Sequence, residues 1–350
     1  MESPKTAALL GASGYTGADL LRLGVRHPGL KFVALTANTH AGKPMASVFP
    51  HLAVADLPDL VSNEDVDFSD IDVVFCGLPH GNSQKLVAEI AQKNASVRVI
   101  DMGADFRFRN ADDYGPVYGA DHVAPELQKM AAYGLTEHNR DAIRGASIVA
   151  CPGCYPTATL LALLPLVTSG AISTDDMIID AKSGVTGAGR APKQNTLMAE
   201  AGESLTPYGV GVHRHAPEIE QEIGLAAGKK VAVNFTPHLI PMSRGELITA
   251  HVRLDGAKNA DEVRKTLSDA YAGEPFIRIA EKGVIPSTGH VRGSNYCVIN
   301  VFDDRIPGRV IVIAAIDNLV KGSAGQAIQN FNVAFGYPEA TAIEALPLFP

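Results

Sequence analysis

The sequence predicts an α/β protein with two domains, one built on a doubly wound parallel sheet and one of α+β type built on a mixed sheet. The chain has 350 residues, and about 150 residues is a common domain size. It is 46% hydrophobic and 19% charged, which leaves enough apolar surface for a large core. Short apolar runs alternate with amphipathic stretches up to about residue 150, where half-exposed strand patterns take over.

Apolar runs in the first part of the chain predict the strands of the parallel sheet. Helical spacing of apolar residues follows two of these runs, over Tyr15–Arg26 and Ser83–Gln92. Strands that are apolar throughout and are separated by helices are typical of a parallel sheet covered on both faces. The predicted strands are Ala7–Leu10, Phe32–Leu35, Ile71–Cys76, Val97–Ile100 and Ser147–Ala150.

The later part of the chain has a different pattern. Polar residues alternate with apolar ones within Leu247–Leu254, which favours a half-exposed antiparallel or mixed sheet. Helices are predicted at Asn259–Tyr271 and Asn318–Phe335, and the second is long enough to pack back on the first domain. We therefore place the first domain at 1–150 with 318–350, and a substrate and oligomerisation domain at 151–317. Its other strands are expected at Met177–Asp180, Lys230–Val233, Phe276–Ile279, Val298–Val301 and Val310–Ile316.

Composition narrows the class of protein. Thirty Lys and Arg against 38 Asp and Glu give a formal charge of −8, whereas a nucleic-acid partner favours a basic field. The longest apolar run, Val310–Ile316, is far shorter than the roughly 18 residues of a membrane span, and the first residues lack the features of a signal peptide. Four cysteines are too few for a disulfide framework. We expect a cytoplasmic protein with neither nucleic-acid nor membrane partners.

A glycine-rich loop follows the first predicted strand. Gly11, Gly14 and Gly17 are spaced G-x-x-G-x-x-G and open the first helix. Glycines there allow close approach of the backbone to a pyrophosphate, which the free N–H groups of the helix start can bind. This predicts a Rossmann-type dinucleotide site, although a tight turn without a ligand would show the same glycines.

The loop after the second strand indicates which dinucleotide binds. An NAD site places an acidic residue about 20 residues beyond the glycines, on the ribose 2′-hydroxyl. No acidic residue occurs between Asp19 and Asp56, and Thr36, Asn38 and Lys43 suit a 2′-phosphate instead. We therefore expect NADP(H); the alternative is a polar loop that is indifferent to the 2′ position.

The segment Cys151-Pro-Gly-Cys154 joins a predicted strand to a helix. Cys154 lies at the helix start, where the helix dipole and free N–H groups favour a thiolate. A single nucleophilic cysteine in a nicotinamide enzyme suits both halves of the chain. A zinc site lacks partner ligands, because Cys76 and Cys297 are isolated, and we predict no metal. A C-x-x-C exchange site and two buried structural thiols remain as alternatives.

Taken together, the motifs resemble the N-acetyl-γ-glutamyl-phosphate reductase family of arginine biosynthesis. The resemblance runs from residue 7 to about 337, and its cysteine and His-Arg-His motifs are specific to this family. The related aspartate-semialdehyde dehydrogenases share the glycine loop and the Asp-Asn-Leu tail but differ around the cysteine and histidine. The segments that carry the resemblance are Gly11–Gly17, Cys151–Thr157, Ser183–Arg190, His213–Glu218 and Asp317–Gly322.

The resemblance implies a reaction. NADPH-dependent reductive dephosphorylation converts N-acetyl-L-glutamyl 5-phosphate into N-acetyl-L-glutamate 5-semialdehyde and inorganic phosphate, through a thioester on the cysteine. It also implies that Cys154 is the nucleophile and His213 the acid/base, in a dimer or tetramer of identical chains. The cofactor contacts it implies are Gly11, Ser13, Gly14, Tyr15, Thr16, Gly17, Ser183, Gly184, Gly187 and Asn318.

Further residues complete the expected site. Spacing alone does not choose between His213 and His215 as the base, and His215 either orients the site or caps a helix. Leu78 and Pro79 follow the third strand and are expected to line the nicotinamide side, unless they form an ordinary turn. Because arginine binds phosphate and carboxylate bidentately, we expect some of four loop arginines to bind substrate rather than lie on the surface. These are Arg107 and Arg190, the preferred pair, with Arg214 and Arg244.

Three other functions stay open. The first is a related acyl-phosphate reductase acting on aspartyl or acylated aminoadipyl phosphate, which would use identical chemistry. The second is a non-catalytic NADP-binding protein, which would need neither Cys154 nor His213. The third is a thiol-redox or metal protein, which would depend on Cys151 as well as Cys154.

Overall fold

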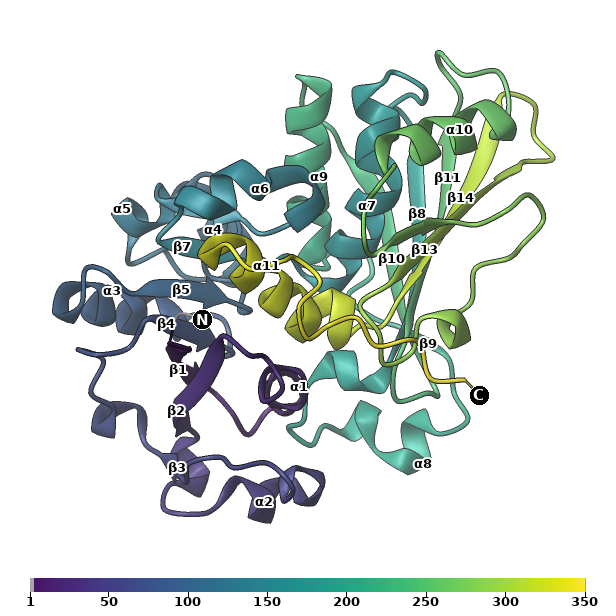
Figure 1. The fold of residues 1–350 in the computed structure, drawn as a ribbon. Coiled ribbons are helices and arrows are strands. Elements are labelled where there is room, and N and C mark those ends of the chain that lie inside the picture. Colours follow the sequence, from purple (N-terminus) through teal and green to yellow (C-terminus); the bar gives the residue numbers. More distant parts are fainter. Residues whose placement is uncertain (1–2, 350) are drawn as a thin grey trace. The chain divides into compact units, whose positions relative to one another are not determined.

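A computed structural model describes residues 3–349, and the chain folds into two compact units (Figure 1). The first unit runs up to Pro152 and includes Ser323–Glu344. The second comprises Gly153–Gly322 and the residues from Ala345 on. Among the described residues, no helix combines the length and apolar character that crossing a bilayer requires.

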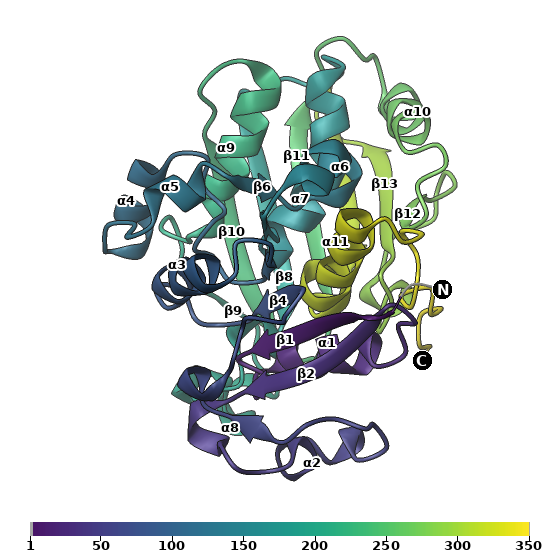
Figure 2. The same ribbon diagram turned by 60° about the vertical axis from the view of Figure 1, so that its left-hand side comes forward.

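The first unit contains the predicted parallel sheet. Within its described residues seven strands, all parallel, lie in the order β3-β2-β1-β4-β5-β7-β6, and Figure 2 shows β1 and β2 side by side. The order reverses between β1 and β4, and dinucleotides bind at the carboxyl ends of strands at such a switch point. The strands are β1 (Lys5–Leu10), β2 (Leu30–Thr36), β3 (Leu60–Val61), β4 (Val73–Cys76), β5 (Arg98–Asp101), β6 (Ala131–Tyr133) and β7 (Ile148–Ala150).

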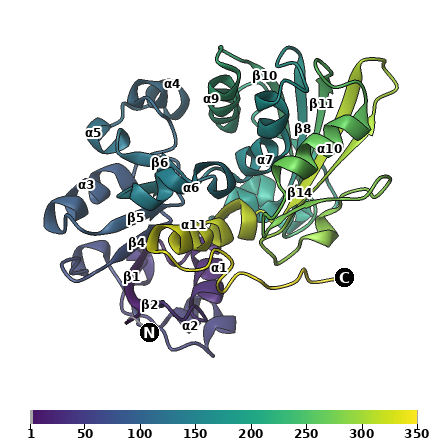
Figure 3. The ribbon, with the colours of Figure 1, turned by 45° about the horizontal axis from the view of Figure 1, so that its top comes forward.

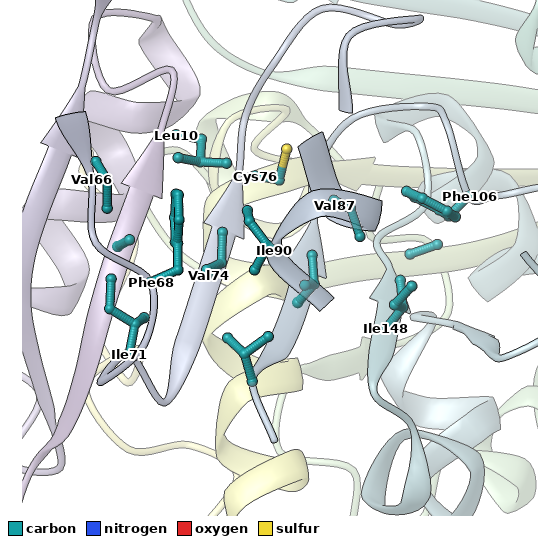
Figure 4. Packing of buried hydrophobic residues seen from close by; sticks show 14 residues of the cluster. Leu10, Val66, Phe68, Ile71, Val74, Cys76, Val87, Ile90, Phe106 and Ile148 are labelled. Atoms are coloured by element: carbon teal, nitrogen blue, oxygen red, sulfur yellow. The ribbon is translucent and has the colours of Figure 1, made fainter. Parts of the chain in front are cut away.

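Helices cover both faces of this sheet, which explains why strands such as β4 and β7 are wholly apolar and buried. On one face Val87 and Ile90 of α3 pack on side chains such as Leu10, Val74 and Ile148 (Figure 4). On the other face the Phe331 ring of α11 lies 5.9 Å from that of Phe75. The helices of the unit are α1 (Tyr15–Gly24), α2 (Met45–Val48), α3 (Ser83–Lys93), α4 (Tyr114–Tyr118), α5 (Pro125–Gln128), α6 (Thr136–Gly145) and α11 (Gly325–Phe335).

The second unit is built on the predicted mixed sheet. Within the described part of this unit, seven strands lie in the order β12-β13-β14-β11-β8-β10-β9, with parallel and antiparallel pairs. Its strands are β8 (Met177–Gly184), β9 (Thr206–Pro207), β10 (Val233–Ile240), β11 (Glu246–Arg253), β12 (Ile277–Ile279), β13 (Cys297–Asp303) and β14 (Arg309–Ile316). Helices α7 (Cys154–Thr168), α9 (His215–Ala227) and α10 (Ala260–Ala270) pack along it (Figure 3); α8 (Met198–Ala201) belongs to the loop before β9.

Two predicted elements are wrong in detail. The strand predicted at Lys230–Val233 begins only at Val233 and continues through Pro237 to Ile240. Pro237 is tolerated because β10 borders only the two-residue strand β9 on its outer edge, where a missing N–H costs no ladder bond.

The helix predicted to begin at Asn318 starts instead with a π-helical turn at Val320–Ala324 and becomes α-helical at Gly325. Asp317 satisfies the first backbone donors, because its Oδ1 accepts from the N–H groups of Leu319 and Val320. Asp317 therefore caps this segment.

Candidate active site

The glycine loop has the geometry of a phosphate cradle. Gly11 has φ +77°, and a Cβ atom on it would lie 2.7 Å from the carbonyl oxygen of Gly77. A Cβ on Gly17 would lie 2.7 Å from the carbonyl oxygen of Ala12. Within the described chain no side chain caps the start of α1 at Gly14, and its first turn carries no acidic residue. The N–H groups of this helix start are therefore suited to bind an anion.

A cavity of about 600 Å³ opens beside this loop. Six predicted cofactor residues line it, namely Gly11, Ser13, Thr36, Asn38, Leu78 and Pro79. Lys43 is exposed and is not among the lining residues, whereas Lys85 on α3 is. Sequence reasoning missed Lys85 because it belongs to no motif and reaches the cavity only through the packing of α3. Two carboxylates, Glu64 and Glu89, also border the cavity.

Arg107, predicted to bind substrate, lies buried in the first unit. Its Nε donates to the carbonyl oxygen of Cys151 at 2.9 Å, and its Nη2 donates to that of Met102 at 3.3 Å. The guanidinium thus ties the ends of β5 and β7 together. Nearby, the Asp105 carboxylate accepts from the N–H groups of Gly81 and Ser83, which holds the loop that follows Leu78 and Pro79.

Cys151 is also buried in the first unit. The side-chain amide of Asn330 donates to its Sγ at 3.5 Å, and burial raises the pKa of the thiol to about 12. A thiol with that pKa carries almost no thiolate near neutral pH.

Cys154 has a different environment in the second unit. It is the first residue of α7, a helix so thoroughly buried that every residue from Tyr155 to Val167 is inside, and it is itself partly exposed. The N–H of the preceding Gly153 donates to Glu218 Oε1 at 2.9 Å. A Cβ on Gly322 would lie 2.7 Å from the Cys154 Cβ, so only glycine leaves room for this cysteine. The helix dipole favours the thiolate here.

Both predicted histidines lie in one aromatic cluster of the second unit. The rings of His213 and His215 are 4.8 Å apart, and each lies within 6 Å of Tyr155. His213 Nδ1 accepts the backbone N–H of His215 at 3.2 Å. Burial, helped by the charge of Arg214, lowers the pKa of His213 to about 4. The imidazole is therefore neutral at pH 7, and its remaining proton is on Nε2.

His215 begins α9 and faces the peptide before the nucleophile. A Cβ on Gly153 would lie 2.5 Å from His215 Nε2, which explains why glycine precedes Cys154. The hydroxyl groups of Tyr155 and Tyr208 are 3.3 Å apart at the edge of the same cluster. His213 and His215 thus share one site, although Arg214 between them has helical rather than extended backbone angles.

The Gly-rich segment after β8 meets the end of β14. Asn318 accepts from the N–H of Gly245 at 2.8 Å and donates to Thr186 Oγ1 at 3.0 Å. A Cβ on Gly187 would lie 2.9 Å from Ser183 Oγ, and one on Gly184 would lie 2.8 Å from the carbonyl oxygen of Met242. The structure therefore brings together the four cofactor residues predicted in this unit.

The remaining arginines lie in the second unit, two at the surface and one partly buried. Arg190 and Arg214 are exposed, and Arg244 Nη1 lies 3.5 Å from Asp317 Oδ1.

One residue near the nucleophile was not predicted. Glu246, the first residue of β11, is completely buried, and it interacts with the Cys154 side chain. Burial, reinforced by the nearby Asp317, raises the pKa of Glu246 to about 8, against the opposing effect of that interaction. Its sequence context, the start of an alternating strand, carries no catalytic signal.

Comparisons with known proteins agree along the whole chain. Residues 6–146 match the family described as "Semialdehyde dehydrogenase, NAD binding domain", and residues 154–318 match "Semialdehyde dehydrogenase, dimerisation domain". N-acetyl-gamma-glutamyl-phosphate reductase of Rhodospirillum rubrum is 53% identical over the full length of both chains. The enzyme of that name from Paracoccus denitrificans is 49% identical, covering 98% of this chain and 99% of its own.

Solved structures share the fold at lower identity. Aspartate semialdehyde dehydrogenase II of Vibrio cholerae, complexed with ASA, superposes with a TM-score of 0.74 at 19% identity, covering 96% of this chain and 99% of its own. The aspartate semialdehyde dehydrogenase of Candida albicans with NADP gives a TM-score of 0.65 at 17% identity, covering 95% and 98%.

Proposed function

The chain belongs to the N-acetyl-γ-glutamyl-phosphate reductase family of semialdehyde dehydrogenases, and we propose that Cys154 and His213 carry out the family's reaction in it. That reaction is the NADPH-dependent reduction of N-acetyl-L-glutamyl 5-phosphate to N-acetyl-L-glutamate 5-semialdehyde, a step of arginine biosynthesis. The observation that carries the proposal is the partly exposed Cys154 at the start of the buried helix α7, beside the neutral His213 cluster.

Cys154 supplies the nucleophile. Its thiolate attacks the acyl carbon, phosphate leaves, and a thioester forms. A thioester accepts hydride far better than a carboxylate does, and the covalent bond holds its carbonyl in place. The start of α7 stabilises the thiolate before the attack and again when the thiohemiacetal releases it.

His213 serves the carbonyl oxygen. Its Nδ1 is occupied by the N–H of His215, so Nε2 carries the proton and donates a hydrogen bond to the oxygen on which negative charge develops. His215 holds this tautomer through its backbone and contacts the Gly153 peptide through its ring. Both roles require the pair, which accounts for two histidines two residues apart.

The first unit holds NADPH, which supplies the hydride when bound. Gly11, Ser13, Gly14, Tyr15, Thr16 and Gly17 form the pyrophosphate cradle, and Leu78 and Pro79 border the cavity beyond it. Asn38 would contact the 2′-phosphate with no opposing carboxylate from its own loop, and we add Lys85 as the cation there in place of the exposed Lys43. Thr36 is buried and accepts from the N–H of Gly11, so it would shape the cavity wall. We propose cofactor-binding roles also for Ser183, Gly184, Gly187 and Asn318, which lie together in the second unit.

Substrate recognition falls to the arginines of the second unit. Arg190, Arg214 and Arg244 supply cations for the phosphate and carboxylate groups of the substrate. Arg107 keeps a supporting role, because it already donates to the carbonyl groups of Cys151 and Met102. The protein acts as a cytoplasmic homo-oligomer, a dimer or tetramer, in which the half-exposed residues of β8, β11 and β14 suit contact with a second copy.

The test is a reverse assay with purified protein. N-acetylglutamate semialdehyde, NADP and inorganic phosphate should yield NADPH, and omission of phosphate should abolish the signal because only an acyl-phosphate-forming enzyme needs it. Aspartate semialdehyde serves as the competing substrate. No NADPH formation by folded, reduced protein, or a preference for aspartate semialdehyde, would refute the assignment.

A further inference from the structure

A buried carboxyl group, that of Glu246, lies beside the nucleophile and is needed neither for the attack by Cys154 nor for the hydrogen bond from His213. Glu246 pairs with Ser183 of β8 and Ile316 of β14 in the middle of the mixed sheet. Ile248 and Ala250, which follow on the same face of β11, are completely buried, and α7 packs against this strand. The Glu246 side chain therefore lies on the α7 side of the sheet, where α7 begins with Cys154.

The hydrogen bonds of Glu246 are unusual for a buried carboxylate. Among the described residues no N–H or O–H group donates to either of its oxygens, and its interaction is with the Cys154 thiol. A carboxylate kept inside for structural reasons is normally satisfied by backbone or cationic donors, because burying it unpaired costs several kcal/mol. Asp317 is such a case, since it accepts from three backbone N–H groups and lies beside Arg244.

The groups that face Glu246 favour exchange of a proton. Asp317, also completely buried, opposes a second negative charge. Tyr155 and Tyr208 both interact with Glu246, and burial raises the pKa of each hydroxyl, so neither supplies a charge. Cys154 is the one neighbour among these whose proton must leave during the reaction.

We propose that Glu246 is the proton partner of the Cys154 sulfur, a catalytic residue for the reaction that the proposed function assigns to this site. The Glu246 carboxylate takes the thiol proton, and the resulting thiolate, stabilised by the start of α7, attacks the acyl carbon. Phosphate leaves with the electron pair of the broken C–O bond and takes up a proton from solvent. After hydride transfer the thiohemiacetal alkoxide collapses, and the departing thiolate recovers its proton from the Glu246 carboxylic acid. Glu246 thus exchanges a proton with the sulfur, while His213 donates a hydrogen bond to the carbonyl oxygen.

Proton affinities agree with this division. A raised carboxyl pKa near 8 is close to that of a cysteine thiol, about 8.5, so a proton moves between the two groups with little change in free energy. The pKa of His213 is lowered to about 4, so that imidazole has too low a proton affinity to hold the same proton near neutral pH. Two groups this strongly linked titrate as a pair.

Alkylation of Cys154 by iodoacetamide tests the proposal without substrate. The rate is followed from pH 5.5 to 10 by mass spectrometry of the Cys154 peptide, in the wild type and in Glu246→Gln. Removing a negative charge from beside the thiol should shift the alkylation midpoint to lower pH. The same variant should lose about 100-fold in kcat/KM of the reverse assay, a typical contribution of a proton-transfer group. Faster alkylation with slower turnover is a combination that a merely structural role does not produce.

Two further variants keep the result interpretable. Glu246→Asp keeps a shortened carboxyl group and should recover part of the lost activity, whereas Glu222→Gln removes another buried carboxylate of the same unit and should match the wild type. An unchanged alkylation midpoint in Glu246→Gln, or full activity in that variant, overturns the proposal for Glu246. Full activity of Cys154→Ser instead overturns the proposed function itself, so the two failures are distinguishable.

Discussion

Cys151 and Cys154 are three residues apart in the sequence and chemically opposite in the structure. Cys151 ends in the core of the first unit, where burial and the bond from Asn330 leave it a protonated thiol. Cys154 begins a helix in the second unit and remains partly exposed. Each has a buried carboxyl group with a raised pKa nearby, Asp101 in one case and Glu246 in the other. Solvent exposure of the thiol and its position at a helix start, rather than the neighbouring carboxyl group, decide which cysteine can react.

The largest expected effect separates the two cysteines directly. Cys154→Ser should lower the phosphate-dependent reverse rate by about 10⁴-fold or more, because the hydroxyl cannot replace the thiolate. Cys151→Ser should keep most of the activity, since its thiol only fills space and accepts one hydrogen bond. Initial rates of NADPH formation decide this, with folding of both variants checked by circular dichroism. An inactive, folded Cys151→Ser would reverse the comparison.

The next effect concerns the acid beside Cys154. The folded-state pKa of Glu246 is raised from 4.5 to about 8, so the native state binds the proton more tightly than the unfolded state, and stability falls as pH rises through that window. The Gln side chain in Glu246→Gln does not titrate, so the variant does not lose stability in this way. Relative to wild type, the variant should gain on the order of a few kcal/mol in unfolding free energy between pH 4.5 and pH 8.5. Urea denaturation at the two pH values measures it; an equal difference at both would show that the carboxyl group does not titrate on folding.

For Asp101 we expect stability to change with pH in the same direction as for Glu246, over a narrower pH range. Burial raises its pKa from 3.8 to about 7, so the wild type loses stability between these values while Asp101→Asn does not. Because one pKa unit corresponds to about 1.4 kcal/mol, we expect a gain of about 3–4 kcal/mol for the variant at pH 8 relative to pH 4. Its turnover should remain near that of the wild type, in contrast to Glu246→Gln. A large loss of turnover in Asp101→Asn would show that the two carboxyl groups do not differ in their importance for the reaction.

The smallest effect concerns the cofactor loop of the first unit. Asn38→Asp places a carboxylate in the cavity wall where the 2′-phosphate is proposed to bind. The KM for NADPH should rise about tenfold, equivalent to 1.4 kcal/mol, while the KM for NADH should fall or stay unchanged. Gln92→Glu adds the same charge at an exposed position of α3 and serves as the control. Equal changes for both cofactors would argue against recognition of the 2′-phosphate by this loop.

Local patterns in the sequence determined much of the protein. Uninterrupted apolar runs predicted the parallel sheet, because a strand covered on both faces buries most of its side chains. The glycines at 11 and 17 were informative because any side chain there would collide with backbone. Alternation in β11 predicted the half-exposed sheet. Cys154 was recognisable because a helix start alters thiol chemistry locally, so the residue and the reason for its reactivity are neighbours in sequence.

Tertiary structure alone decided the rest. Glu246 lies 92 positions from Cys154, and Lys85 lies far from the glycine loop, so no spacing rule connects either to its site. Pro237 sits in a strand because the outer edge of β10 is almost unpaired, and Asp317 caps the last helical segment. Arg107 is surrounded by carbonyl groups that come from two different strands. Burial and hydrogen-bond satisfaction depend on elements that meet only in the folded chain, and these decide which of the chemically able residues can act.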